Sequence, residues 1–184
     1  LGLTTSYLAS VNSASVCHTI EGAPKLAELA KQNFSKLYIN NIEAHVGNID
    51  EILPEVLKTL PTIDFAFFDA NHTKEATMRY FHLCLSKING KSMFVFDDIH
   101  WSEEMVSAWN EIKNHPKVRV SLDVYEMGIL YFDEELQKGD FVVQKKKKSY
   151  SNNKIQGKPF YSQYTLKYKV SIFCKYMSDA VKCF

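Results

Sequence analysis

Two short apolar stretches, each followed by aspartate, constrain the fold of this chain more than any other feature of its sequence. Residues 63–68 and 92–96 are almost continuously apolar, which is typical of strands covered on both faces. A helical repeat of apolar residues follows each stretch, at residues 73–88 and 102–116. Because helices alternate with covered strands, the pattern predicts a parallel sheet with helical crossover connections.

The rest of the first 144 residues continues this alternation. The last two predicted strands are close in sequence, so we expect them to form an antiparallel hairpin. The whole pattern predicts an α/β fold with a Rossmann-like, doubly wound sheet. Further strands are predicted at residues 15–20, 42–46, 118–125 and 128–132, and further helices at residues 3–9, 24–37 and 49–57, the last interrupted near Pro54.

Composition excludes several other classes of protein. The chain has 184 residues, of which 46% are apolar and 23% charged, and this suits one globular core rather than a disordered polymer. No run approaches the roughly 18 to 20 uninterrupted apolar residues of a membrane span. The four cysteines form no CxxC pair, so neither a disulfide scaffold nor a structural zinc site is indicated. We expect a soluble, cytoplasmic protein with reduced, mostly buried thiols.

The C-terminal 40 residues differ from the body in charge. Residues 145–184 hold ten Lys and one acid, whereas residues 1–144 hold twelve Lys or Arg and twenty acids. We interpret residues 145–184 as a basic, low-complexity tail that is partly disordered. Clustered Lys with interleaved Tyr can bind nucleic acid, but we favour an extension without that role. Apolar and polar residues alternate at 166–172 as they do in a strand, although the elements predicted in residues 1–144 do not require another strand.

Polar residues follow the predicted strands at the edge where ligands bind in open α/β sheets. Glu21 ends one strand just before the helix that begins near Pro24. A carboxylate here can accept hydrogen bonds from two ribose hydroxyls, or it can simply cap that helix, and the spacing favours neither. The residues at this edge are Glu21, Asn48, Asp69, Asp97 and Asp98.

Three of these acids also offer oxygen ligands for a hard divalent cation such as Mg²⁺. They are Asp69, Asp97 and Asp98, and on sequence alone we prefer the alternative that they cap helices or turns. His72 and His100 lie in the loops after these acids, where each is either a general base or a loop residue bonded to backbone. We interpret the remaining histidines as structural (His18, His45) or as helix-surface residues (His82, His115).

Five segments in this order resemble the class I S-adenosylmethionine-dependent methyltransferases, in particular the small O-methyltransferase-like group. The resemblance covers roughly residues 1–144. It implies methyl transfer from S-adenosylmethionine to a small acceptor, with oxygen as the atom methylated. The segments are Leu1-Gly2-Leu3-Thr4-Thr5, Thr19-Ile20-Glu21-Gly22, Val46-Gly47-Asn48-Ile49, Asp64-Phe65-Ala66-Phe67-Phe68-Asp69-Ala70-Asn71-His72 and Phe94-Val95-Phe96-Asp97-Asp98-Ile99-His100-Trp101.

The resemblance also assigns residues to the cofactor and to the acceptor. Gly2 corresponds to the end of the family's glycine-rich turn, Glu21 to its ribose-binding acid, and Asp69 to the acid beneath the cofactor. The adenine loop falls on Gly47, Asn48 and Ile49, and the acceptor side falls on Asp97, Asp98, His72 and His100. Metal-dependent relatives hold Mg²⁺ at positions that fall on Asp69, Asp97 and Asp98, although this chain has Asp98 where those relatives have Asn.

One feature of the family has no counterpart in this sequence. The family's strand order is 3-2-1-4-5-7-6, and its central first strand has no counterpart in residues 1–184, so we expect this chain to be a methyltransferase truncated at its N-terminus. We therefore expect a gap or a non-native pairing at the centre of the sheet, and impaired cofactor binding. The alternative function is a catalytically impaired remnant that acts as a binding module. A dinucleotide oxidoreductase is less consistent with the sequence because no G-x-G-x-x-G motif is present.

Overall fold

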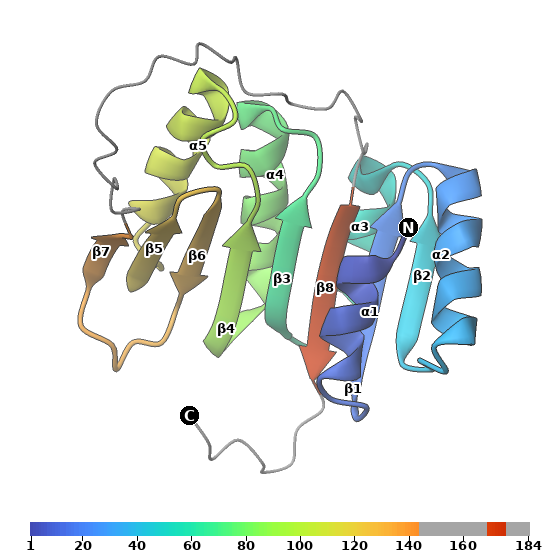
Figure 1. Cartoon of the computed structure of the whole chain (residues 1–184). Helices are drawn as coiled ribbons and strands as arrows, with labels where there is room; N and C mark the ends of the chain where they lie inside the picture. The colour runs from blue at the N-terminus through green and yellow to red at the C-terminus, as the bar shows by residue number, and fades with distance from the viewer. Residues whose placement is uncertain (144–168, 176–184) are drawn as a thin grey trace, which may run out of the picture.

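A computed structural model describes residues 1–143 and 169–175 of the chain. Its described residues form one eight-stranded mixed sheet in the order β2-β1-β8-β3-β4-β6-β5-β7 (Figure 1). The strands are β1 (Ser15–Glu21), β2 (Ile42–Val46), β3 (Ile63–Asp69), β4 (Ile88–Phe96), β5 (Val120–Val124), β6 (Met127–Tyr131), β7 (Gly139–Val142) and β8 (Lys169–Lys175). The helices are α1 (Leu3–Ser10), α2 (Pro24–Lys36), α3 (Ile49–Thr59), α4 (Lys74–Cys84) and α5 (Glu103–Lys113), with a 3₁₀ turn at Leu85–Lys87.

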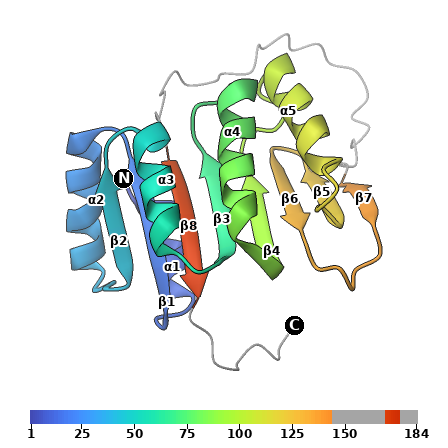
Figure 2. The same cartoon turned by 180° about the vertical axis from the view of Figure 1, so that it is seen from behind.

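The doubly wound fold predicted from the sequence is confirmed. Strands β1 and β2 pair in parallel, as do β3 and β4, and each pair is joined through a helix. Helix α1 covers one face of the sheet, while α3, α4 and α5 lie on the other, which Figure 2 shows from behind. The expected antiparallel hairpin is present as β5 and β6, and β6 runs antiparallel to β4.

Strand β8 occupies the centre of the sheet, where the family's first strand is expected. It runs antiparallel to both neighbours, so that Val170 pairs with Ile20 of β1 and with Phe68 of β3. The expected non-native pairing is therefore what the structure contains. Our interpretation that no part of the body calls for a strand near residues 166–172 is wrong, because β1 and β3 each offer an inner edge of backbone donors and acceptors that must be paired.

The position of β8 bears on the expected tail. Seven residues beyond residue 144 lie inside the sheet, where their backbone pairs with β1 and β3 of the body. The expected disorder of residues 145–184, and their interpretation as an extension without a nucleic-acid role, otherwise concern residues outside the described part. The division of the chain at residue 144 stays a prediction.

Two boundaries differ from those predicted. Helix α4 ends at Cys84, and β4 begins at Ile88, so the expected helix stop at Asn89 and Gly90 lies within a strand. Helix α3 continues through Pro54 without interruption. A proline removes one backbone donor from a helix, but the tertiary packing of Leu53, Val56 and Leu57 in the core holds this one together.

The core lies mainly between the sheet and helices α3, α4 and α5. Phe81, Phe94 and Phe96 are almost fully buried there, with ring centroids 6.1 to 6.5 Å from Phe81 to the two strand residues. Cys17 and Cys84 are buried, as expected for these thiols. Within the described residues, no helix combines the length and the hydropathy that a membrane crossing requires.

Candidate functional site

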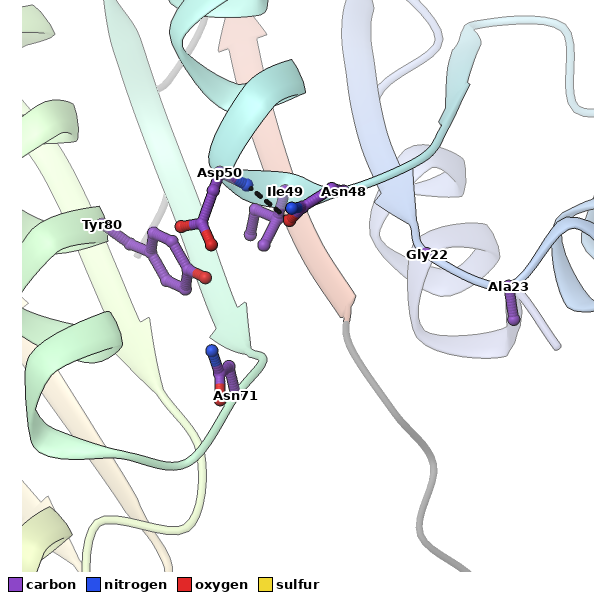
Figure 3. Close-up of a pocket in the computed structure, with 7 residues that line it drawn as sticks. All are labelled: Gly22, Ala23, Asn48, Ile49, Asp50, Asn71 and Tyr80. Atoms are coloured by element: carbon purple, nitrogen blue, oxygen red, sulfur yellow. Dashed lines mark hydrogen bonds between the residues drawn. The ribbon is translucent and has the colours of Figure 1, made fainter.

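A pocket of about 470 Å³ opens at the carboxyl ends of β1, β2 and β3 (Figure 3). Ligands of open α/β sheets bind at this edge because the loops after successive parallel strands meet there. Each of the three strands contributes its following loop, and α4 contributes one aromatic side chain. The pocket is lined by Gly22 and Ala23 after β1, Asn48, Ile49 and Asp50 after β2, Asn71 after β3, and Tyr80 of α4.

Tyr80 brings a buried polar atom to the pocket wall. The residue is 1% exposed, and within the described residues its hydroxyl makes no hydrogen bond of ordinary geometry, although Asp50 and Asn71 lie close enough to influence its pKa. Figure 3 shows the hydroxyl pointing between Asp50 and Asn71. Burial raises the pKa of this phenol, so it remains a neutral donor at physiological pH. An unsatisfied buried hydroxyl is costly, and a polar group of a bound ligand is a natural partner for it.

The turn between β2 and α3 is shaped by its sequence. Asn48 caps α3, and its side-chain oxygen accepts a hydrogen bond from the Asp50 backbone N–H at 3.0 Å. Gly47 has φ of 142°, and a Cβ there would lie 2.9 Å from the Cδ1 atom of Ile52. The turn thus keeps the N-terminus of α3 and the side chain of Ile49 against the pocket.

Glu21 is buried at the end of β1, and its Oε1 atom accepts a hydrogen bond from the Ala23 N–H at 3.0 Å. Ala23 is the N-cap of α2, so the carboxylate holds the turn that leads into the helix, and this bond does not go to the N–H groups of the first helical turn. The bond uses one carboxylate oxygen and leaves the second able to accept from a ligand. Both interpretations of Glu21 stay predictions.

Gly2 is required where α1 begins. Its φ is 76°, and a Cβ on it would lie 2.5 Å from a ring atom of Phe34 and 2.9 Å from the Cβ of Ala30, both on α2. A residue with a side chain fits neither the backbone conformation nor the space. The glycine thus lets α1 and α2 approach closely.

Beside the pocket, two of the acids predicted at this edge of the sheet lie close to the imidazole of His72. The Nε2 atom of His72 lies 3.6 Å from the Oδ1 atom of Asp69 and 3.7 Å from the Oδ2 atom of Asp98. Asp98 has φ of 54°, and its N–H donates to the Oδ1 atom of Asp97 at 3.0 Å. A non-glycine residue in this left-handed region stores strain, which is common at functional sites.

The cluster changes the proton affinity of its members. Interaction with Asp69 raises the pKa of His72, and the charge of Asp98 adds to this effect. Burial raises the pKa of Asp97 to about 6, and the negative charges of Asp69 and Asp98 contribute. Burial also raises the pKa of Asp98. The site therefore favours the protonated form of His72 and makes Asp97 easier to protonate than an ordinary aspartate.

The arrangement does not fit the predicted metal site without a change in conformation. The imidazole of His72 lies beside both Asp69 and Asp98, where a cation between these carboxylates would need to be. Within the described residues, the group with three ligand atoms inside 4.8 Å of one another lies elsewhere and does not include Asp69, Asp97 or Asp98. A divalent ion at these three acids stays a prediction, and we derive no chemical step through it.

His100 is placed apart from this cluster. Its Nε2 atom lies 2.8 Å from the Oδ2 atom of Asp123 at the end of β5, and its side chain is 46% exposed.

Sequence reasoning missed Tyr80, Asn71 and Asp50 as pocket residues. Tyr80 falls on the apolar stripe of its helix, and a tyrosine hydroxyl within such a stripe is the signal that points to a buried polar function.

Comparisons with known proteins identify the family of this chain. A family model described as a methyltransferase domain matches residues 1–99, more than half of the chain. The chain therefore belongs to this methyltransferase family. A search of curated proteins finds no match.

Three solved structures of other proteins show the same fold at low sequence identity. At this level of identity, the likeness concerns the fold alone, and the chain spans 59% to 69% of the length of the three proteins. They are a putative O-methyltransferase from Klebsiella pneumoniae (15% identity, 71% of this chain and 68% of that one, TM-score 0.59), an O-methyltransferase from Bacillus cereus in complex with SAH (17%, 71% and 69%, 0.58) and an SAH-bound methyltransferase from Podospora anserina (16%, 62% and 59%, 0.51).

Proposed function

We propose that this chain binds S-adenosylmethionine in the pocket at the ends of β1, β2 and β3 and methylates an oxygen of a small acceptor. The observation that carries the proposal is the position of the pocket, because the loops that line it are those that the family resemblance assigns to the cofactor. Two of the solved structures with this fold are described as bound to SAH, the demethylated cofactor, which supports the same assignment.

The lining residues suit an adenosine group. The side chain of Ile49 offers an apolar surface to a base, and the polar groups of Asn48, Asp50 and Asn71 surround it. The unpartnered hydroxyl of Tyr80 offers a hydrogen bond. The second carboxylate oxygen of Glu21 accepts from the ribose, with Gly47 holding the adjacent turn. Gly2 and Asp69 border the remainder of the cofactor, as the resemblance implies.

When bound, the cofactor supplies an electrophilic methyl group, and the protein contributes alignment and proton transfer. Asp97 is suited to take the acceptor's proton, because a base with a pKa of about 6 is largely ionised at neutral pH and still basic. His72, whose pKa is raised by Asp69 and Asp98, is suited to orient the acceptor oxygen by donating to it. Asp98 fixes His72, and His100 lies further out with Asp123.

Calorimetric titration of SAH into the chain tests the proposal. We expect binding by the unaltered chain, about tenfold weaker binding by Tyr80→Phe, and a larger loss in Glu21→Gln, because buried polar groups of the ligand lose their partners. Tyr38→Phe is the matched control, since Tyr38 is 87% exposed and outside the pocket. Binding that is equal in all four proteins, or preferential binding of a nicotinamide dinucleotide, contradicts the proposal.

A second candidate function, a binding module with impaired cofactor affinity, is favoured by the register of β8. The backbone of Lys169 pairs with Glu21 on one side and with Asp69 on the other. In the family this central position leads into the glycine-rich turn that approaches the cofactor. Absence of SAH binding by a folded chain supports this second function, and ordinary affinity excludes it.

A further inference from the structure

Three potential metal ligands gather on neighbouring strands away from the acidic cluster. His18 lies on β1, and Glu43 and His45 lie on β2, the edge strand of the described sheet. Glu43 and His45 are two positions apart on the strand, so their side chains lie on the same face of the sheet. His18 is the register partner of Glu43, which places all three side chains on that same face.

The two distances from His18 to the other members of this trio are close to those between ligands of a tetrahedral metal ion. The Nδ1 atom of His18 lies 3.2 Å from the Nε2 atom of His45 and 3.4 Å from the Oε2 atom of Glu43. Ligands at zinc bond lengths of about 2.0 to 2.2 Å are separated by roughly 3.3 to 3.6 Å in a tetrahedron. All three ligand atoms lie within 4.8 Å of one another.

The two imidazoles are already arranged as a pair. Their ring planes differ by 11° and their centroids are 5.5 Å apart, and one imidazole nitrogen donates a hydrogen bond to the other. A cation that binds both nitrogens would take the place of this proton. His18 is 7% exposed at its side chain and Glu43 is 60% exposed, so the inner ligand is shielded while ions reach the site past the carboxylate.

We propose that His18, Glu43 and His45 form a binding site for a first-row divalent transition metal, of which Zn²⁺ is the best fit. Two imidazoles and one carboxylate select such ions over Mg²⁺ and Ca²⁺, which require more oxygen ligands. The bound ion links β2 to β1 and secures the edge of the sheet. The structural role assigned to His18 and His45 from sequence then becomes a metal-binding role.

Titration of Zn²⁺ into the metal-free full-length chain tests this site. We expect binding with one ion per chain and a higher midpoint of thermal unfolding, because an ion that binds only the folded state stabilises it. His45→Ala removes a ligand at a partly buried position, and we expect more than a hundredfold weaker binding, beyond the roughly 10- to 100-fold loss typical of outer-shell partners. Glu43→Gln changes only an exposed ligand and gives a second, less disruptive variant.

A matched control uses the other close histidine pair. His82 and His115 have ring centroids 5.9 Å apart, and His82→Ala should bind Zn²⁺ as the unaltered chain does. The absorption spectrum with Co²⁺ should show a four-coordinate ion without a thiolate charge-transfer band, since no cysteine is a proposed ligand. Failure to bind Zn²⁺, unchanged binding by His45→Ala and Glu43→Gln in folded protein, or a thiolate band each overturns the proposal.

Discussion

Among the residues proposed to face the acceptor, Asp97 is the one whose pKa the fold changes most. Its pKa of about 6 results from burial and from the nearby charges of Asp69 and Asp98. A base with this pKa gains its active, ionised form as the pH rises through about 6. We therefore expect kcat/KM for methyl transfer to rise with pH up to a plateau above that value.

Two variants test the source of that pH dependence. Asp97→Asn should abolish the rising limb and lower the plateau about 10²- to 10⁴-fold, the usual contribution of a general base. The imidazolium of His72 lowers the pKa of Asp97, so His72→Gln should move the limb to higher pH. Glu134→Gln, at an exposed position, is the control. A limb that persists in Asp97→Asn assigns the proton transfer to another group.

Gly2 supplies a stability prediction at the same scale. Gly2→Ala places a Cβ 2.5 Å from the Phe34 ring at a φ of 76°, and both the overlap and the left-handed backbone are unfavourable. We expect the free energy of unfolding to fall by about 2 to 4 kcal/mol in a denaturant titration. Gly90→Ala is the control, because a Cβ there meets nothing within 4 Å. Equal stability of the two variants contradicts this account.

Residues at strand ends could be predicted, while residues brought together across strands could not. The rule that parallel strands end at one edge is sufficient to place Asp69 and Asp98 near His72. The trio of His18, Glu43 and His45 depends on the register between β1 and β2, and no local pattern specifies a register. Tyr80 was missed for a different reason. It lies on the apolar face of its helix, so the helical pattern indicates a core residue and gives no sign of a hydrogen-bond donor.

At the scale of elements, hydrophobic periodicity identified the helices of the body and every strand except β7, which was not predicted. It also predicted the hairpin of β5 and β6, but not which other strands lie side by side. The alternation near residues 166–172 indicates a strand, yet only the unpaired inner edges of β1 and β3 determine where it lies. The same limit affects the end of α4. Ile88 to Gly90 resemble a helix terminus locally, but Ile88 pairs with Ile63 and so belongs to β4.

Strand β8 should be intolerant of proline because it has neighbours on both sides. Ile172 pairs with His18 and with Ala66, and Ile172→Pro removes a backbone donor from the middle of the sheet. We expect a loss of about 3 kcal/mol or more in the free energy of unfolding. Thermal or denaturant unfolding monitored by circular dichroism measures the change.

Val142→Pro is the matched control for this strand. Val142 lies on β7, an edge strand of the described sheet, and is 57% exposed. The N–H of Val143 donates to Asp123, so the N–H of Val142 points away from the neighbouring strand. A proline there should cost far less than Ile172→Pro. Equal losses for the two variants, or no loss for Ile172→Pro, contradict the central position of β8.

At the scale of the whole molecule, β8 joins two parts of the sheet that are otherwise separate. Strands β2 and β1 lie on one side of it, and β3, β4, β6, β5 and β7 lie on the other. The pairing of β5 with β6 connects residues close in sequence, whereas that of β1 with β8 connects residues such as Ser15 and Lys175. Contacts so distant in sequence carry a large loop-closure cost during folding.

The order of folding should follow from this topology. In pulsed hydrogen exchange during refolding, we expect the amides of β5 and β6 to become protected first and those of β1 and β3 that pair with β8 to become protected last. Ile172→Pro should slow or remove the late protection and leave the early protection unchanged, because the hairpin does not contact β8 in the sheet order. Simultaneous protection of both sets of amides would show that the centre of the sheet forms together with its edge.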